Sequence, residues 1–222
     1  MNKNMTELVF ILDRSGSMSG LEDDTIGGFN GMLERQKATE QQVNVTTVLF
    51  DDKVDIIHDR FPISVIQPLT REDYYVRGCT ALLDAIGTAI RKIENVQTHM
   101  PEDYRAGKVI FVITTDGHEN SSRMYTYSAI HELIEAKRKE GWEFLFLGAN
   151  IDAVGEAGRL GIRENRAVTY MNDQKGVALN YEVVGKAVCH AINASEGEEL
   201  FKDDWDEEIE KYYDMRQRGG SN

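Results

Sequence analysis

The segment that decides the fold is residues 7–19, with the sequence ELVFILDRSGSMS. Its apolar residues 8–12 follow one another with no polar residue between them. Such a run predicts a strand that is buried on both faces, as in a parallel sheet covered by helices. The run ends at Asp13, and ligands of open α/β sheets bind beyond the carboxyl ends of the strands. The segment therefore predicts a central strand with a binding site at its end.

Apolar runs of strand length alternate with stretches of helical periodicity along the rest of the chain. The predicted strands are residues 7–13, 43–50, 54–58, 108–114, 142–147 and 167–170. The predicted helices are residues 20–39, a long helix from Thr80, residues 128–139 capped by Ser128, residues 152–160 and residues 177–194. Residues 51–53 predict a hairpin turn, which makes one strand an antiparallel edge strand. We therefore expect an α/β fold, a three-layer αβα sandwich with a mostly parallel central sheet.

The C-terminal segment, residues 196–222, differs in composition from the rest of the chain. It is rich in Asp and Glu, yet Phe201, Trp205, Ile209 and Tyr212 recur at helical spacing. This spacing predicts one apolar stripe on an acidic helix, which either packs on the domain or docks to a basic partner. We expect one domain over residues 1–195, followed by an acidic C-terminal helix and a tail that is frayed from Arg218.

Three segments at predicted strand ends or helix starts carry side-chain oxygens. Asp13, Ser15 and Ser17 follow the first strand, Thr80 begins the long helix, and Asp116 follows a later apolar strand. If those strands are parallel neighbours, the three segments meet at one edge of the sheet. Two carboxylates and three hydroxyls form an oxygen-only set, which hard cations such as Mg²⁺ prefer. Because Mg²⁺ usually keeps waters, an incoming carboxylate or phosphate oxygen has a position to take.

Each of these residues also has an ordinary structural interpretation. Asp13, Ser15 and Thr80 are residue types that cap helices, and Asp116-Gly117 is a common turn pair. The joint occurrence of all of them, in order and each at a strand end or helix start, favours the metal site.

This set of residues resembles the von Willebrand factor type A (vWA) domain family. Asp13, Ser15 and Ser17 match its D-x-S-x-S motif, Thr80 matches its isolated threonine, and Asp116 matches its later aspartate. These five positions form what is known in the family as the metal-ion-dependent adhesion site. The resemblance covers most of the chain and implies a Rossmann-like fold, with sheet order 3-2-1-4-5-6 and one antiparallel edge strand.

The resemblance also implies a function. It implies Mg²⁺, or Mn²⁺ or Ca²⁺, held partly through waters, and a protein partner whose acidic side chain completes the metal shell. Residues 144–162 look more like the stand-alone bacterial or phage members than like animal adhesion domains. Residues 1–8 contain no signal-peptide pattern, so we expect a cytoplasmic scaffold role rather than adhesion to matrix.

Loop residues around the predicted site are candidates for choosing the partner, since binding residues tend to lie on loops carried by a rigid scaffold. The candidates are Arg14, Met18, Arg77, Glu119, Asn120 and Arg123. Three arginines in so acidic a chain favour an acidic partner, although each also fits an ordinary surface charge.

Enzymatic functions receive less support from the motifs. A phosphoryl-accepting Asp13, as in haloacid-dehalogenase-like phosphatases, needs a second aspartate where Ser15 stands, and the G-x-S-x-G, P-loop and dinucleotide motifs do not occur. The remaining alternative is a metal-assisted phosphoester hydrolase at the same site, with His118 as general base. A further alternative is a scaffold that binds through the acidic C-terminal helix. We predict a non-enzymatic, metal-dependent protein-binding domain.

Composition limits the classes of partner and of compartment. The chain has 25 Lys and Arg against 38 Asp and Glu, a net charge of −13. This charge argues against nucleic acid and against an anionic membrane surface as the main partner. No run approaches the ~20 apolar residues of a membrane span. The two cysteines, Cys79 and Cys189, are expected to be free thiols in a reducing compartment, and the cytoplasm is the expected location.

Overall fold

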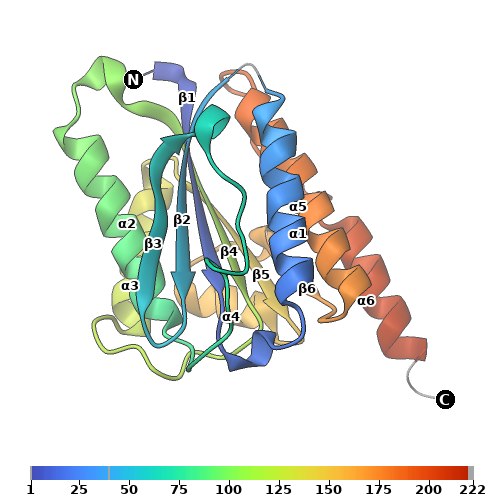
Figure 1. The fold of residues 1–222 in the computed structure, drawn as a ribbon. Helices are drawn as coiled ribbons and strands as arrows, with labels where there is room; N and C mark the ends of the chain where they lie inside the picture. Colours follow the sequence, from blue (N-terminus) through green and yellow to red (C-terminus); the bar gives the residue numbers. More distant parts are fainter. Residues whose placement is uncertain (1, 40, 220–222) are drawn as a thin grey trace.

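The computed structural model describes residues 2–39 and 41–219, which form a sheet between two layers of helices (Figure 1). The strands are β1 (Asn2–Asp13), β2 (Gln42–Phe50), β3 (Val54–Pro62), β4 (Ala106–Thr115), β5 (Glu143–Ala149) and β6 (Ala167–Tyr170). The sheet order is β3-β2-β1-β4-β5-β6, and the β2–β3 pair alone is antiparallel among these strands. The predicted fold class, strand order and antiparallel edge strand are confirmed.

Helices cover both faces of this sheet. The helices α1 (Glu22–Lys37), α5 (Gln174–Asn193) and α6 (Glu207–Gly219) lie on one side, and α2 (Leu82–His99), α3 (Tyr127–Lys139) and α4 (Ala153–Leu160) lie on the other (Figure 1). Within the described residues, short 3-10 helices lie in the connecting segments at Gly16–Met18, Ile63–Val65, Glu102–Tyr104 and Glu164–Arg166. Among the described residues, no helix combines the length and the apolar character needed to cross a membrane.

The central strand β1 explains why both faces of the sheet are covered. Leu8, Phe10 and Leu12 are buried in the core with side chains of α1 and α5. Val9 and Ile11 are buried in the core with side chains of α2, α3 and α4. Because successive side chains of a strand point to opposite faces, an unbroken apolar run requires a hydrophobic layer on each side.

Several predicted boundaries differ from the structure. The strand β3 continues past His58 to Pro62, since Phe61 and Pro62 still pair with β2 after two register shifts. The helix α3 is capped by Thr126, whose hydroxyl accepts from the Ala129 amide at 3.3 Å, and the prediction of Ser128 as cap is wrong. The helix after Thr80 begins at Leu82, so Thr80 lies in the preceding loop.

The C-terminal segment is helical over only part of the predicted stripe. Phe201 and Trp205 lie in turns before α6, although Phe201 is buried like Ile209 of the helix. The Trp205 indole donates to the Asn165 carbonyl at 3.0 Å, so side-chain contacts with the body hold this irregular segment. The helix α6 includes Arg218, which corrects the predicted fraying there, and residues 220–222 lie outside the described residues.

Candidate metal site

The predicted site lies at the carboxyl ends of the parallel strands, the lower edge of the sheet in Figure 1. Asp13 ends β1, and Asp116 follows the end of the neighbouring strand β4. The loop after β1 meets the loop before α2, because the Gly16 amide donates to the Gly78 carbonyl at 3.3 Å. Gly78 has a φ of +69°, a conformation that favours glycine. The topology thus brings three loops to one place.

The five predicted oxygen-bearing residues converge there. The Ser15 and Ser17 hydroxyl oxygens are 3.1 Å apart, and the Ser17 hydroxyl donates to Asp116 Oδ1 at 2.5 Å. A Cβ atom built on Gly117 would lie 3.2 Å from Thr80 Oγ1 and 3.5 Å from Ser17 Oγ. The Thr80 hydroxyl and the serine hydroxyl therefore face the same small space, next to the Asp116 carboxylate.

Asp13 is buried, as are Ser15 and Thr80, and its carboxylate is held from two sides. Its Oδ1 accepts from the Ser15 amide at 2.7 Å, and its Oδ2 accepts from the Thr115 hydroxyl at 2.6 Å. Burial raises the pKa of Asp13 to about 6, and the nearby charge of Asp116 acts in the same direction. Burial also raises the pKa of Asp116. Two carboxylates that share a partly dry site carry an uncompensated charge, which a divalent cation would neutralise.

The chemistry of this donor set fits a hard cation. No group of three or more His, Cys, Asp or Glu side chains among the described residues is placed to hold a metal. This site differs from such a group because hydroxyls outnumber carboxylates. Ser15 precedes the 3-10 helix Gly16–Met18 as its N-cap residue, but its hydroxyl makes no capping hydrogen bond, and the N-cap residue of α2 is Ala81 rather than Thr80. Neither hydroxyl is therefore occupied in capping a helix. Small, neutral oxygen ligands beside two carboxylates suit an ion that retains part of its water shell.

Two of the predicted partner-binding residues are buried, and the interpretation of them as surface contacts is corrected. The Arg14 side chain is only 3% exposed and pairs with Asp51 at 2.9 Å and with Asp55. Met18 is 2% exposed. The backbone of the first loop turns both side chains inward, so neither faces a partner.

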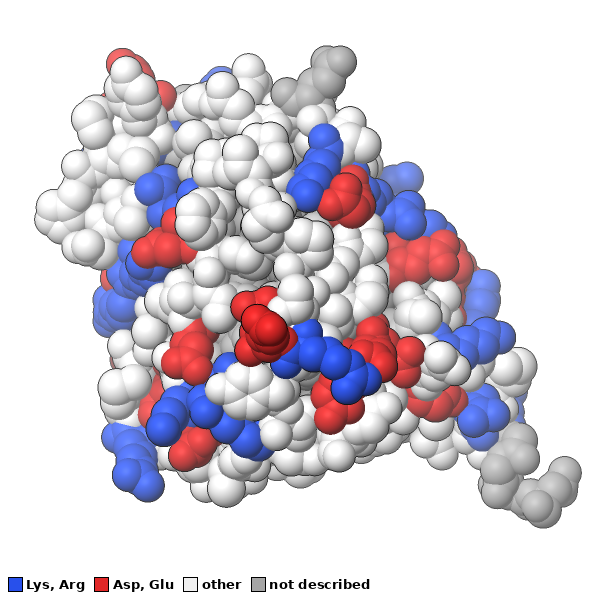
Figure 2. All heavy atoms as spheres, in the orientation of Figure 1, with Lys and Arg blue, Asp and Glu red and all other residues white. Residues whose placement is uncertain are grey.

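A cluster of Arg14, Asp51, Asp55, Tyr75 and Arg77, here called the arginine cluster, links the loops beside the site. Arg77 Nε donates to Asp51 Oδ2 at 2.6 Å, and the guanidinium groups of Arg14 and Arg77 lie 5.3 and 5.2 Å from the centre of the Tyr75 ring. Burial works to raise the pKa of Asp51, but its hydrogen bonds and the arginines lower it overall. In Figure 2, basic and acidic side chains lie side by side over the lower part of the visible face.

The remaining predicted residues lie on the loop after Asp116. Glu119 Oε2 accepts from the Leu83 amide at 3.0 Å, and Asn120 Oδ1 accepts from the Thr80 amide at 2.9 Å. Glu119 and Asn120 therefore position the loop that carries Thr80 and the start of α2. Arg123 is exposed, as is Asn120. These exposed residues remain the candidates for contact with a partner.

Sequence reasoning missed three residues that support the site. Thr115 holds Asp13, as described above, and the Tyr74 hydroxyl donates to the Asp13 carbonyl at 2.5 Å. Asn172, in the loop after β6, donates from Nδ2 to Asp116 Oδ2 at 3.4 Å. The TTDG sequence was an available signal for Thr115. The sequence around Asn172 does not indicate a contact with Asp116. Asn172 follows β6 and Asp116 follows β4, and β5 lies between these two strands in the sheet.

Comparisons with known proteins agree with this fold. No family model and no curated protein matches the sequence. Among solved structures, the vWF domain of the type V pili tip protein Mfa5 from Porphyromonas gingivalis matches with a TM-score of 0.61 at 12% identity, over 87% of this chain and 98% of that one. Proximal thread matrix protein 1 (PTMP1) from the mussel byssus matches with a TM-score of 0.56 at 15% identity, over 85% of this chain and 48% of that one.

A third match is a von Willebrand factor type A structure from Catenulispora acidiphila, with a TM-score of 0.53 at 14% identity, over 85% of this chain and 43% of that one. This chain thus spans about half the length of the mussel and Catenulispora chains. It has the fold of a von Willebrand factor type A domain. A further structure of the mussel protein matches with a TM-score of 0.54 at 17% identity. That structure has zinc in its metal-ion-dependent adhesion site (MIDAS) motif.

Proposed function

We propose that this chain is a divalent-metal-dependent protein-binding domain. The observation that carries the proposal is the convergence of three hydroxyls and two carboxylates from three separate loops. Asp13, Ser15, Ser17, Thr80 and Asp116 would hold the cation. Zinc in the corresponding motif of the mussel protein supports a divalent ion, and the all-oxygen donor set favours Mg²⁺, or Mn²⁺ or Ca²⁺.

The residues of the site have different roles, which follow from their exposure. The exposed Ser17 and the partly exposed Asp116 face solvent, where a partner approaches, while Asp13 supplies negative charge from below. When bound, the cation supplies a positive charge and a coordination position for an incoming oxygen. The arginine cluster and Asn120 hold the loop after β1 and the loop that carries Thr80 in fixed positions relative to each other. A preformed site of this kind loses little conformational entropy when it binds.

The partner in this proposal is a protein that presents an acidic side chain. A carboxylate is the hard, anionic ligand that completes a Mg²⁺ shell, and exposed Arg123 lies on the loop that follows Asp116. The proposal extends to a cytoplasmic protein of bacterial or phage type. The two free cysteines, Cys79 and Cys189, support a reducing compartment. No specific observation favours the hydrolase, since His118 is exposed and lies outside the hydrogen bonds found within the described site.

Metal binding is tested by thermal melting of metal-stripped protein with and without Mg²⁺. A ligand at 100 times its dissociation constant adds about 2.7 kcal/mol to the free energy of unfolding. For a domain of this size that corresponds to a rise in Tm of about 5–11 °C. The matched pair of variants is Ser17→Ala and Ser19→Ala, since both serines are exposed and only Ser17 bonds to Asp116.

We expect the rise in Tm for the parent and for Ser19→Ala, and a much smaller rise for Ser17→Ala. Absence of any rise with Mg²⁺, Mn²⁺ or Ca²⁺ would contradict the metal site. The acidic partner is tested by selecting displayed peptides in Mg²⁺ and replacing each Glu or Asp of the binders by Gln or Asn. Binders that tolerate this replacement, or that bind in the presence of a chelator, would contradict the proposed mode of recognition.

A further inference from the structure

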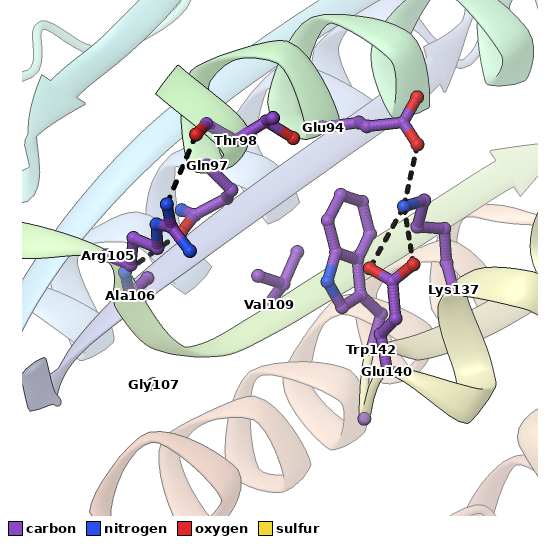
Figure 3. Close-up of a pocket in the computed structure, with 11 residues that line it drawn as sticks. Glu94, Gln97, Thr98, Arg105, Ala106, Gly107, Val109, Lys137, Glu140 and Trp142 are labelled. Atoms are coloured by element: carbon purple, nitrogen blue, oxygen red, sulfur yellow. Dashed lines mark hydrogen bonds and ion pairs between the residues drawn. The ribbon is translucent and has the colours of Figure 1, made fainter. Parts of the chain in front are cut away.

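A second hollow lies at the opposite end of the sheet from the metal site. Its volume is about 400 Å³, which is within the range of small-molecule sites. It is formed by the last turns of α2, the start of β4 and the turn between α3 and β5 (Figure 3). This pocket shares no residue with the metal site, and nothing in the proposed function uses it.

Two residues that line this pocket, Gln97 and Arg105, have N–H donors with no acceptor among the described residues. Gln97 Nε2 is buried and unpartnered, while Gln97 Oε1 accepts from the Ala106 amide at 3.1 Å. Arg105 donates from Nε to the Met100 carbonyl and from Nη2 to the Thr98 carbonyl, which leaves Nη1 free of described partners. A buried donor without an acceptor costs free energy, so this end of the pocket favours a ligand that brings an acceptor.

The acidic side chains of the wall are already engaged. Lys137 Nζ lies 2.7 Å from a Glu94 carboxylate oxygen and 2.8 Å from a Glu140 oxygen, as the dashed lines in Figure 3 show. The same ammonium group lies 5.2 Å from the centre of the Trp142 ring. Figure 3 shows Gln97 and Arg105 at one end of the pocket and this lysine cluster at the other. The charged ligand group is therefore expected at the Arg105 end.

Between the two ends the wall is apolar and rigid. Trp142 stacks on Phe111 with ring centres 5.7 Å apart and an interplanar angle of 13°. Val109 lies between the two ends in Figure 3. The indole N–H of Trp142, unlike that of Trp205, has no described acceptor. A flat apolar group fits such a surface, and a second acceptor on it would meet the indole N–H.

We propose that this pocket binds an organic carboxylate that carries a flat apolar group. Its carboxylate accepts hydrogen bonds from Arg105 and Gln97, and its apolar group lies along Val109 against Trp142. Arg105 is suited to this role because a charged N–H donor such as its Nη1 makes a shorter and stronger hydrogen bond to a carboxylate than a neutral donor does. The same chemistry occurs in a free aromatic acid and in the C-terminal residue of a peptide, and the experiment separates these two sources.

The probe is phenylacetate, and the readout is the fluorescence of Trp142. The chain has two tryptophans, so a Trp205→Phe background leaves Trp142 as the sole reporter. A ligand of this size is expected to bind with a dissociation constant of about 1 mM. Phenylacetamide, which has the same shape without the charge, is expected to bind at least about tenfold more weakly. The titrations are made in a chelator, so their result does not depend on the metal site.

The decisive variant is Gln97→Glu, which keeps the acceptor for the Ala106 amide and replaces the unpartnered donor by a negative oxygen. Its matched control is Gln67→Glu, which adds the same charge at an exposed position away from the pocket. We expect Gln97→Glu to weaken phenylacetate binding at least about tenfold and Gln67→Glu to leave it unchanged. If Gln97→Glu does not fold, Arg105→Met is measured under the same criterion.

The two sources are separated by comparing phenylacetate with N-acetylphenylalanine. Tighter binding of phenylacetate supports a free aromatic acid, and tighter binding of N-acetylphenylalanine supports a peptide C-terminus. The proposal is overturned if neither carboxylate gives a saturable change, if phenylacetamide binds as well as phenylacetate, or if a folded Gln97→Glu variant binds phenylacetate as the parent does.

Discussion

The two ends of the central sheet carry the same kind of charge cluster with opposite signs. Beside the metal site, buried Asp51 lies between Arg14 and Arg77. At the other end, buried Lys137 lies between Glu94 and Glu140. The clusters differ in one outer member. Arg14 is only 3% exposed, whereas Arg77 is 35% exposed and the two glutamates are 27% and 54% exposed.

The burial of Arg14 predicts that the fold depends more on the arginine cluster than on the lysine cluster. A buried charge that loses its partner has no access to water, whereas an exposed carboxylate is hydrated when its partner is removed. The arginine cluster also joins the first loop, the β2–β3 hairpin and the loop before α2. We therefore assign the arginine cluster to the architecture of the metal site and the lysine cluster to the rim of the second pocket.

The largest effect is expected for Asp51→Ala. Its removal leaves the buried Arg14 guanidinium without its main partner, which should lower the free energy of unfolding by about 3 kcal/mol. The control is Asp59→Ala, since Asp59 also pairs with a basic residue but is 57% exposed, and a loss below about 1 kcal/mol is expected. Urea denaturation measures both, and equal losses for the two variants would break the distinction between buried and exposed pairs.

The next largest effect concerns the pH dependence of metal binding. The pKa of Asp13 is raised by burial to about 6, so protons compete with the cation below that pH. Mg²⁺ affinity is expected to fall about tenfold for each pH unit below 6. Calorimetric titration at pH 5, 6 and 7.5 measures this fall.

The metal-free protein should show the opposite trend. The folded pKa of Asp13 lies above its ordinary value of 3.8, so the folded state binds more protons than the unfolded state between about pH 4 and 6. The contribution of Asp13 to stability therefore decreases as pH rises through this interval, while metal affinity increases. Asp13→Asn serves as the control and should reduce both dependences to the part that Asp116 contributes, since burial raises the pKa of Asp116 as well. An affinity that does not change between pH 5 and 7.5 would exclude Asp13 as a metal-linked group.

A smaller effect is expected for Gly117→Ala. The added Cβ would lie 3.2 Å from Thr80 Oγ1 and 3.5 Å from Ser17 Oγ, so it crowds two hydroxyls of the site without meeting the core. Mg²⁺ affinity should fall about fivefold, equivalent to about 1 kcal/mol, with little change in stability without metal. Gly31→Ala is a suitable control, because a Cβ at Gly31 meets no atom within 4 Å. Comparable metal affinities for the two variants would argue that Gly117 lies outside the site.

The smallest effect is expected for Lys137→Met. Methionine keeps the apolar stem near Trp142 and removes the charge, and the partly exposed glutamates become hydrated. The expected loss of stability is below about 1 kcal/mol, several times less than for Asp51→Ala. Thermal melting of both variants under one condition gives the comparison. A loss as large as that of Asp51→Ala would mean that the lysine cluster is as important to the fold as the arginine cluster.

Much of the fold followed from local patterns. The unbroken apolar runs at residues 8–12 and 108–114 identified strands buried on both faces, and β6 was predicted with its observed bounds. The predicted helix boundaries were wrong where one sequence pattern is compatible with two kinds of local structure. Phe201 and Trp205 have helical spacing, yet consecutive turns also place residues four apart on one side of the chain.

The candidate site was predictable to the same extent. Asp13, Ser15 and Ser17 belong to one short motif, and Thr80 and Asp116 lie where strand ends and helix starts place them. The inward orientation of Arg14 and Met18 was not predictable, because it depends on the path of the loop after β1. Tyr74 and Asn172 reach the site from segments whose sequence carries no sign of it.

The sequence by itself determined the class of fold, the order of its elements and the identity of the oxygen donors. Those properties depend on the hydrophobic periodicity, on the length of apolar runs and on the spacing of residues within one short segment, all of which can be read locally. Only the tertiary structure decided that Asp51 holds the loops of the metal site and that Gln97, Arg105 and Trp142 line one pocket. Such groupings join residues from different elements, and the packing of helices on a twisted sheet, rather than any local pattern, sets their positions.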